Sequence, residues 1–242
     1  MTQALLFDLD GTLIDSSDDL TRALNAAFAK HGLDALSQEE VEPLIGRGAP
    51  ALIERALRTS GQGHLVADSD LLLASFLQCS HEIYDLGRSS TRPYPFALEA
   101  LRELKSMGVP LALVTNKGRE LSVKALRKIN AEPFFTAIVG GDTCPRRKPD
   151  PMPLQWACEL LGVEASSVCM VGDSLNDVQA ARSAGIPVWC VPHGYREGLS
   201  ADNLGADMIV ELHELPALVR ARRLRSKLSP EGTALSLSNG DG

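Results

Sequence analysis

Short apolar runs alternate along the chain with longer segments in which apolar residues recur at helical spacing. The apolar runs cover residues 4–9, 110–115, 136–140, 167–172, 186–191 and 207–210. Most of them are apolar throughout, which is typical of strands buried on both faces of a parallel sheet. The helical segments lie between them, at residues 96–107, 118–130, 151–162 and 175–184. This alternation predicts an α/β fold built on a doubly wound parallel sheet.

One long interval breaks this alternation, because it contains helical patterns and no convincing strand. Apolar residues from Leu20 to Phe28 follow helical spacing, and Ser37 and Glu40 have the spacing of a helix capping box. We therefore predict an all-helical subdomain at residues 16–91.

The helical insert divides the rest of the chain. We expect residues 1–15 and 92–228 to form one core domain, with a candidate hinge in the polar, proline-containing stretch 89–95. Residues 229–242 are predicted to form a disordered tail, because they are polar and rich in Gly and Ser.

Composition narrows the class of partner. The chain has 242 residues and a net charge of -7, which argues against a dedicated nucleic-acid surface. No apolar run approaches the ~20 residues of a membrane helix, and the N-terminus lacks the features of a signal peptide. The five cysteines form no C-x-x-C pair, and the histidines show no zinc spacing. We expect a cytoplasmic protein, monomeric or homodimeric, with neither nucleic acid nor membrane as a partner.

Polar residues gather where the predicted strands end. Because the carboxyl ends of parallel strands meet at one edge of a sheet, we expect these side chains to lie close together. They are Asp8, Asp10, Thr115, Asn116, Lys117, Lys148, Asp173 and Asp177. Several carboxylates beside a lysine imply a divalent cation and an anionic ligand, and oxygen ligands favour Mg²⁺.

The chemistry of these groups suggests phosphoryl transfer. Asp8 is the candidate nucleophile toward phosphorus, giving an aspartyl-phosphate. Asp10 is placed to protonate the leaving group and then to activate water. Lys148 would neutralise phosphoryl oxygens, and Gly11 would allow a sharp turn close to the phosphate.

The other strand-end residues have supporting roles. Thr115 and Asn116 offer a hydroxyl and amide donors to the phosphoryl group. Asp173 would ligate the metal, and Asp177 would ligate it or orient its waters. We expect Lys117 to point to solvent.

Four sequence motifs together resemble those of the haloacid dehalogenase-like phosphatase superfamily. They are D-x-D-G-T from Asp8, Thr115 at a strand end, Lys148 before a proline, and G-D-x-x-x-D ending at Asp177. The resemblance covers roughly residues 4–215. It implies a Rossmann-like core, an aspartyl-phosphate mechanism with Mg²⁺, and a metal contact from the backbone carbonyl of Asp10. It also implies that the helical insert is a cap domain.

Substrate choice is expected to depend on the insert, at Gly46-Arg47-Gly48. On spacing alone, a plain helix-helix turn with a solvated arginine is equally compatible with these residues. The surrounding sequence is similar to the cap of bacterial phosphoglycolate phosphatases, although Phe96 stands where a glycine is often found. Our hypothesis is that Arg47 and the amides of Gly46 and Gly48 meet the non-phosphate end of a small phosphorylated metabolite, with 2-phosphoglycolate as the best candidate.

Other functions remain open at this stage. They include a phosphatase of a sugar phosphate such as N-acetylmuramic acid 6-phosphate, and a β-phosphoglucomutase-like sugar phosphomutase. A receiver-like signalling module also uses acids and a lysine around Mg²⁺, but the insert and Asp10 argue against it. Asp15 precedes a helix start, and its simplest role is at the hinge of the insert.

Overall fold

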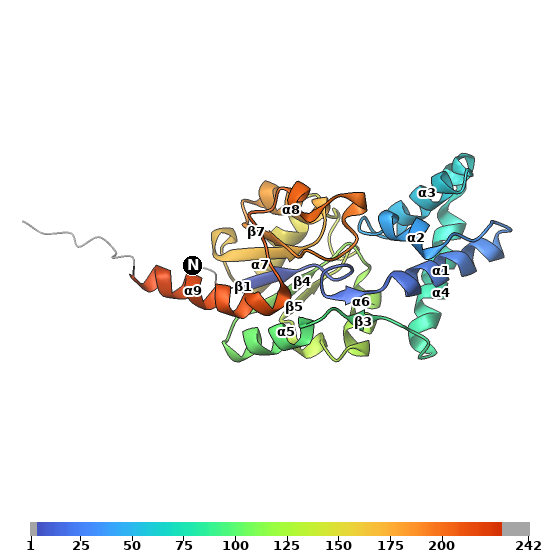
Figure 1. Ribbon diagram of the computed structural model, residues 1–242. Helices are drawn as coiled ribbons and strands as arrows, with labels where there is room; N and C mark the ends of the chain where they lie inside the picture. Colours follow the sequence, from blue (N-terminus) through green and yellow to red (C-terminus); the bar gives the residue numbers. More distant parts are fainter. Residues whose placement is uncertain (1–3, 229–242) are drawn as a thin grey trace, which may run out of the picture.

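The computed structural model describes residues 4–228, and Figure 1 shows an α/β part beside a helical part. In the α/β part six strands form a sheet in the order β5-β4-β1-β6-β7-β8, and each neighbouring pair is parallel. The strands are β1 (Ala4–Phe7), β4 (Leu111–Val114), β5 (Ala137–Val139), β6 (Val168–Gly172), β7 (Val188–Cys190) and β8 (Met208–Ile209). All of them fall inside the apolar runs, so the predicted parallel α/β sheet is confirmed.

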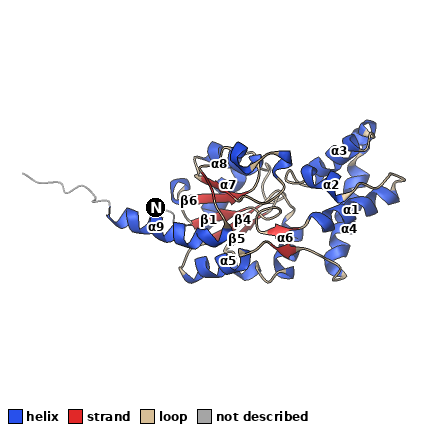
Figure 2. Cartoon of the chain, in the orientation of Figure 1, coloured by secondary structure: helices blue, strands red, loops and turns tan. Residues whose placement is uncertain are grey.

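Helices cover both faces of this sheet (Figure 2). They are α5 (Ala97–Ser106), α6 (Arg119–Lys128), α7 (Met152–Leu161), α8 (Leu175–Ala184) and α9 (Leu215–Leu228). Successive residues of a strand face opposite sides of a sheet. Leu5 and Phe7 accordingly join one buried cluster with α5, α6 and α9, whereas Leu6 joins a second with α7 and α8. The sheet is therefore doubly wound, as its fully apolar strands predicted.

The insert is a helical bundle with a hydrophobic core of its own. Its elements are α1 (Ser17–Lys30), α2 (Gln38–Val41), η1 (Glu42–Leu44), α3 (Ala49–Thr59), η2 (Gly63–Asp68) and α4 (Asp70–Asp85). Leu24, Phe28, Ile53 and Phe76 are buried together at its centre. The predicted capping box is confirmed, because Glu40 N donates to Ser37 Oγ at 3.3 Å and Ser37 N donates to Glu40 Oε2 at 2.8 Å.

A two-stranded antiparallel ribbon, β2 (Ile14–Asp15) with β3 (Arg92–Pro93), carries both chain crossings between the sheet domain and the bundle. The sequence predicted a hinge here and no strand. The ribbon brings the entry and exit of the insert side by side, so the bundle is attached through two adjacent chain segments. An ion pair of 2.7 Å between Arg92 and Asp15 spans the ribbon.

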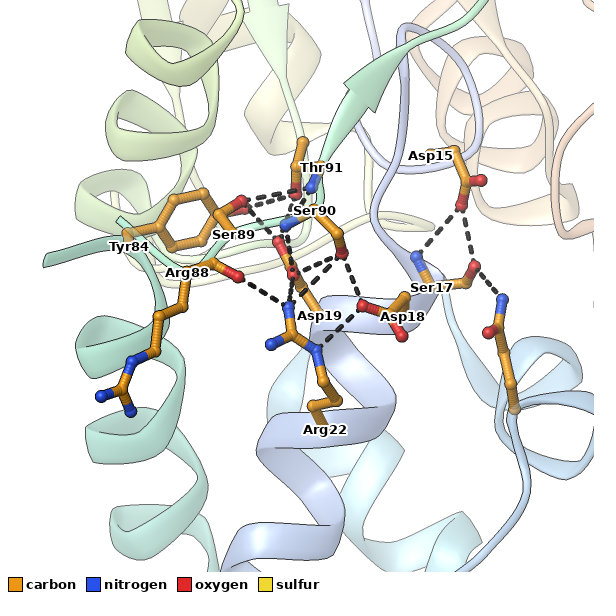
Figure 3. Close-up of polar contacts among 11 residues, drawn as sticks. Asp15, Ser17, Asp18, Asp19, Arg22, Tyr84, Arg88, Ser89, Ser90 and Thr91 are labelled. Carbon is orange, nitrogen blue, oxygen red and sulfur yellow. Dashed lines mark hydrogen bonds and ion pairs between the residues drawn. The ribbon is translucent and has the colours of Figure 1, made fainter. Parts of the chain in front are cut away.

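Asp19, in the first turn of α1, binds the exit segment directly (Figure 3). Its buried carboxylate accepts hydrogen bonds from the hydroxyls of Ser89 and Thr91, both at 2.6 Å. It also accepts one from the backbone N–H of Ser90 at 2.9 Å, and it pairs with Arg22 at 2.5 Å. One carboxylate thus fixes the start of the insert to its end.

Short 3₁₀ turns complete the connections at η3 (Glu132–Phe134), η4 (Ala165–Ser167), η5 (Arg196–Gly198), η6 (Ala201–Leu204) and η7 (Leu212–Glu214). All five cysteines are free thiols. Across residues 4–228, no helix combines the length and the apolar character that crossing a bilayer requires.

Candidate active site

Asp8 stands at the carboxyl end of the central strand β1. Its backbone N–H donates to Val171 O on β6 at 2.9 Å, which fixes the chain as it leaves the sheet. Its side chain is buried, and Oδ1 lies 3.0 Å from the ammonium of Lys148 without accepting a hydrogen bond in proper geometry. Burial raises the pKa of Asp8 to about 6, against the opposing effect of Lys148.

Lys148 reaches this strand end from the loop after β5. Its buried ammonium donates to Asp177 Oδ1 and to the backbone oxygen of Val114, both at 2.6 Å. Burial opposes the charge of Lys148, but Asp177 and Asp8 outweigh it and raise its pKa above the ordinary value. The lysine is therefore held as a cation between two carboxylates. It lies at the carboxyl ends of the strands, the position predicted from the sequence. The peptide bond between Lys148 and Pro149 is cis.

Asp173 and Asp177 follow β6 and face Asp8. Asp173 accepts hydrogen bonds from Thr12 Oγ1 at 2.8 Å and from the backbone N–H of Tyr195 at 3.0 Å. Burial raises the pKa of Asp173 well above its ordinary value, and the carboxylates of Asp177 and Asp8 raise it further. Asp177 Oδ2 accepts from the N–H and the hydroxyl of Ser174 at 3.0 and 2.8 Å, which caps α8.

The three buried aspartates fit a divalent metal ion. Ligand oxygens of Asp8, Asp173 and Asp177 lie within 4.8 Å of one another. Carboxylates this close repel each other, which is the cause of part of the raised pKa values, and a cation between them would offset the repulsion. A set of oxygen donors suits a hard cation, and Asp8 Oδ1 has a buried lone pair to offer it.

Glycine backbone encloses Asp173 on two sides. A Cβ atom on Gly11 would lie 2.4 Å from Asp173 Oδ2, and one on Gly194 would lie 2.6 Å from Asp173 Cβ. Both residues also have positive φ, at +88° and +104°. Gly11 belongs to the sequence motif, whereas Gly194 was not singled out from the sequence.

Asp10 is held by two side chains beside Asp8. It accepts a hydrogen bond from Ser16 Oγ at 2.5 Å and forms an ion pair with Lys117 Nζ at 3.1 Å. The prediction that Lys117 points to solvent is wrong, because only 8% of its side chain is exposed. Burial opposes its charge, but Asp10 outweighs this effect and raises the pKa of Lys117.

Thr115 and Asn116, at the end of β4, are both buried. Asn116 Nδ2 donates to the backbone oxygens of Gly46 at 3.0 Å and Lys148 at 2.9 Å. This side-chain amide therefore joins the insert to the loop that carries the lysine, and it is not free to donate to a ligand. Thr115 Oγ1 accepts from Lys117 N at 3.3 Å, which leaves its hydroxyl proton available.

A cavity of about 60 Å³ lies between the sheet domain and the bundle. Its floor is formed by Asp8, Asp10, Thr115, Asn116 and Lys117. The bundle supplies an apolar roof of Ile45, Leu52, Phe76 and Leu77 together with the backbone of Gly46 and Gly48. Asp8 and Asp10 thus open into a small space that is covered by the insert.

Arg47 lies outside this cavity. Its guanidinium contacts Glu197 twice, with Nε 2.8 Å from Oε1 and Nη2 2.7 Å from Oε2. It lines an open outer groove of about 870 Å³, which also touches Arg147 and Lys148. Sequence reasoning missed Glu197, because its loop carries no recognisable motif. The predicted contact between Arg47 and substrate stays a prediction.

Comparison with known proteins decides the family. Residues 5–191 match the model of haloacid dehalogenase-like hydrolases. The chain belongs to this family. The matched region runs from the second residue of β1 to just beyond β7, and it contains the helical insert and every strand-end residue described above.

Relatives within the haloacid dehalogenase-like hydrolases are similar over most of their length. The phosphoglycolate phosphatase of Nitrosospira multiformis is 39% identical over 227 residues, covering 94% of this chain and 97% of its own. That of Neisseria gonorrhoeae is 40% identical over 193 residues, covering 80% and 81%.

Solved structures of this family have the same arrangement. A predicted phosphoglycolate phosphatase from Haemophilus somnus has a TM-score of 0.80 at 29% identity, covering 90% of this chain and 97% of its own. CbbY from Rhodobacter sphaeroides, solved in complex with phosphate, has a TM-score of 0.74 at 27% identity, covering 89% and 96%.

Proposed function

We propose that this protein is a Mg²⁺-dependent phosphatase that hydrolyses 2-phosphoglycolate to glycolate and phosphate. The observation that carries the proposal is the buried cluster of Asp8, Lys148 and Asp173, whose member Asp8 lines the cavity beneath the bundle. Such a cluster supplies a carboxylate nucleophile and the charges that a phosphoryl group requires. The substrate is supported by relatives named phosphoglycolate phosphatase at 39% and 40% identity.

In the first step Asp8 attacks phosphorus. A bond forms between its carboxylate oxygen and phosphorus, and the bond from phosphorus to the ester oxygen breaks. Asp10 donates a proton to that oxygen, so the product leaves as a neutral alcohol group. Lys148 and the hydroxyl of Thr115 stabilise the phosphoryl oxygens as charge moves onto them.

In the second step Asp10 removes a proton from water. The water oxygen attacks phosphorus, the bond to Asp8 breaks, and phosphate is released. Mg²⁺, which we expect at Asp8, Asp173 and the backbone carbonyl of Asp10, with Asp177 adjacent, would neutralise charge on the phosphoryl oxygens. The roof of the cavity would keep bulk water away from the reacting group.

A phosphate-release assay over a panel of phosphomonoesters tests the proposal. The panel contains 2-phosphoglycolate, an aryl phosphate, β-glucose 1-phosphate and N-acetylmuramic acid 6-phosphate, each measured with Mg²⁺ and after chelation. We expect the highest kcat/KM on 2-phosphoglycolate and a loss of activity with chelator. Asp8→Asn should abolish turnover of every member. Phosphate release by Asp8→Asn at the wild-type rate would show that the proposed nucleophile is wrong.

A further inference from the structure

Lys117 brings a positive charge into the cavity beneath the bundle. Among the lining residues that the structure describes, it is the only lysine or arginine. It begins the segment that follows Asn116 at the end of β4, and 8% of its side chain is exposed. Asp8, Asp10 and Asp19 also line the cavity, so Lys117 is the side chain there whose charge can attract a negative group on an entering molecule.

Two other cations near the site, Arg47 and Lys148, already bind carboxylates of the protein. Arg47 binds both carboxylate oxygens of Glu197 and faces the outer groove. Lys148 is surrounded by Asp8, Asp177 and the oxygen of Val114. Its charge therefore faces Asp8, the proposed nucleophile.

The position of Lys117 relative to Asp10 defines which substrate charge it reaches. Its ammonium lies 3.1 Å from Oδ1 and 3.2 Å from Oδ2 of Asp10. In the proposed reaction Asp10 protonates the ester oxygen, so a group bonded to the first carbon beyond that oxygen lies within reach of the same ammonium. A carboxylate at that carbon is an alternative partner for Lys117 and competes with Asp10.

We propose that Lys117 is a specificity-determining residue that binds the carboxylate adjacent to the ester carbon of the substrate. This inference rests on the proposed phosphatase reaction. When the substrate carboxylate pairs with the Lys117 ammonium, the Asp10 carboxylate loses its ion pair with Lys117 and keeps the hydrogen bond from Ser16. Binding of an anionic leaving group thereby releases Asp10 from Lys117, and Asp10 is the acid that protonates this leaving group.

Two ligands that differ in one group test this exchange. 2-Phosphoglycolate carries the carboxylate, and 2-hydroxyethyl phosphate carries a neutral CH₂OH in its place. Binding of each is measured calorimetrically with saturating Mg²⁺ to Asp8→Asn, which does not turn the ligand over. We expect 2-phosphoglycolate to bind at least about tenfold more tightly, as charge-assisted hydrogen bonds allow. Adding Lys117→Met should reduce that preference to about twofold or less, and Lys117→Arg should retain most of it.

Matched measurements separate recognition from a purely structural role. A lysine that only neutralised Asp10 would weaken both ligands equally when replaced. Lys124→Met is the control, because Lys124 pairs with Asp85 at 2.6 Å and is not among the cavity residues. Lys117→Gln replaces Lys117→Met if thermal unfolding shows the latter to be unfolded.

The outcomes for the two proposals are distinct. Two results would overturn the role of Lys117. One is that Lys117→Met and Lys117→Gln, each added to Asp8→Asn, leave the preference for 2-phosphoglycolate unchanged. The other is that Asp8→Asn itself shows no preference between the two ligands, or binds neither. Absence of phosphate release by the wild-type enzyme contradicts the phosphatase function, whereas the binding comparison still decides what Lys117 recognises.

Discussion

The ammonium of Lys148 lies 2.6 Å from Asp177 Oδ1, and neither side chain has more than 1% of its surface exposed. The other oxygen of Asp177 caps α8 through Ser174. One carboxylate therefore fixes both the lysine that faces Asp8 and the start of a helix. Its removal is expected to disturb the site and the fold together.

Asp177→Asn tests this connection. Breaking one side of a buried ion pair costs about 3–5 kcal/mol of stability. We expect the lower end of this range, because Lys148 loses Asp177 but keeps Asp8 at 3.0 Å. We expect a lower melting temperature and a kcat reduced by about 100-fold, since Lys148 is no longer fixed toward the phosphoryl group. Asp202→Asn makes the same change at an exposed position and should alter neither value. Wild-type kcat in Asp177→Asn would refute the role given to this pair.

Asp19 gives a prediction about acid stability. Burial raises its pKa, but hydrogen bonds from Ser89, Thr91 and Ser90 outweigh burial and lower it from 3.8 to about 2. A carboxyl with a lowered pKa stabilises the fold above its unfolded pKa, and the contribution is lost as the pH falls from about 4 to 2. The shift corresponds to about 2 kcal/mol at neutral pH.

We therefore expect Asp19→Asn to lower the free energy of unfolding by about 2 kcal/mol at pH 7, and by much less near pH 2. Urea unfolding of both proteins across this range measures the difference. Asp18→Asn is the control, because Asp18 is a neighbouring acid whose side chain is 50% exposed. A difference between Asp19→Asn and wild type that stays constant down to pH 2 would count against the assigned pKa.

The sheet and the strand-end acids were predictable from the sequence for a physical reason. Strands buried on both faces are apolar throughout, and their carboxyl ends meet at one edge, so motif order alone placed Asp8, Lys148 and Asp173 together. The ribbon strands β2 and β3 are two residues long and leave no periodic pattern.

Side-chain direction in loops was less predictable. Lys117 was expected in solvent, because the sequence around a lysine at a strand end does not indicate that it will form a buried ion pair with Asp10. Glu197 is brought to Arg47 by tertiary structure across 150 residues of sequence. Phe96 adopts φ 64°, a left-handed backbone conformation that favours glycine, and nothing in its side chain indicates this.

The contact between Arg47 and Glu197 leads to a prediction about the insert. It joins the bundle to the loop after β7, and the arginine side chain is 51% exposed. We expect Arg47→Ala to reduce kcat/KM by about two- to fivefold, equally on 2-phosphoglycolate and on an aryl phosphate, because the arginine is half-exposed and Glu197 keeps Arg55 and Asn176 as partners. Steady-state kinetics of Arg47→Ala and wild type on both substrates measure this loss of kcat/KM. A loss confined to 2-phosphoglycolate would instead support the sequence-based hypothesis that Arg47 binds the substrate.

The last prediction concerns Gly194, whose backbone packs on the candidate metal ligand Asp173. A Cβ atom there would lie 2.5 Å from Gly11 O and 2.6 Å from Asp173 Cβ. Gly194→Ala must therefore displace the β1 turn or Asp173, and we expect weaker Mg²⁺ binding and a kcat lowered by at least about tenfold. Gly198→Ala is a matched control, because Gly198 also has positive φ, +84°, but has no atom within 4 Å of an added Cβ. Both variants carry backbone strain, so equal losses of activity in the two would show that strain, and not contact with Asp173, is the cause.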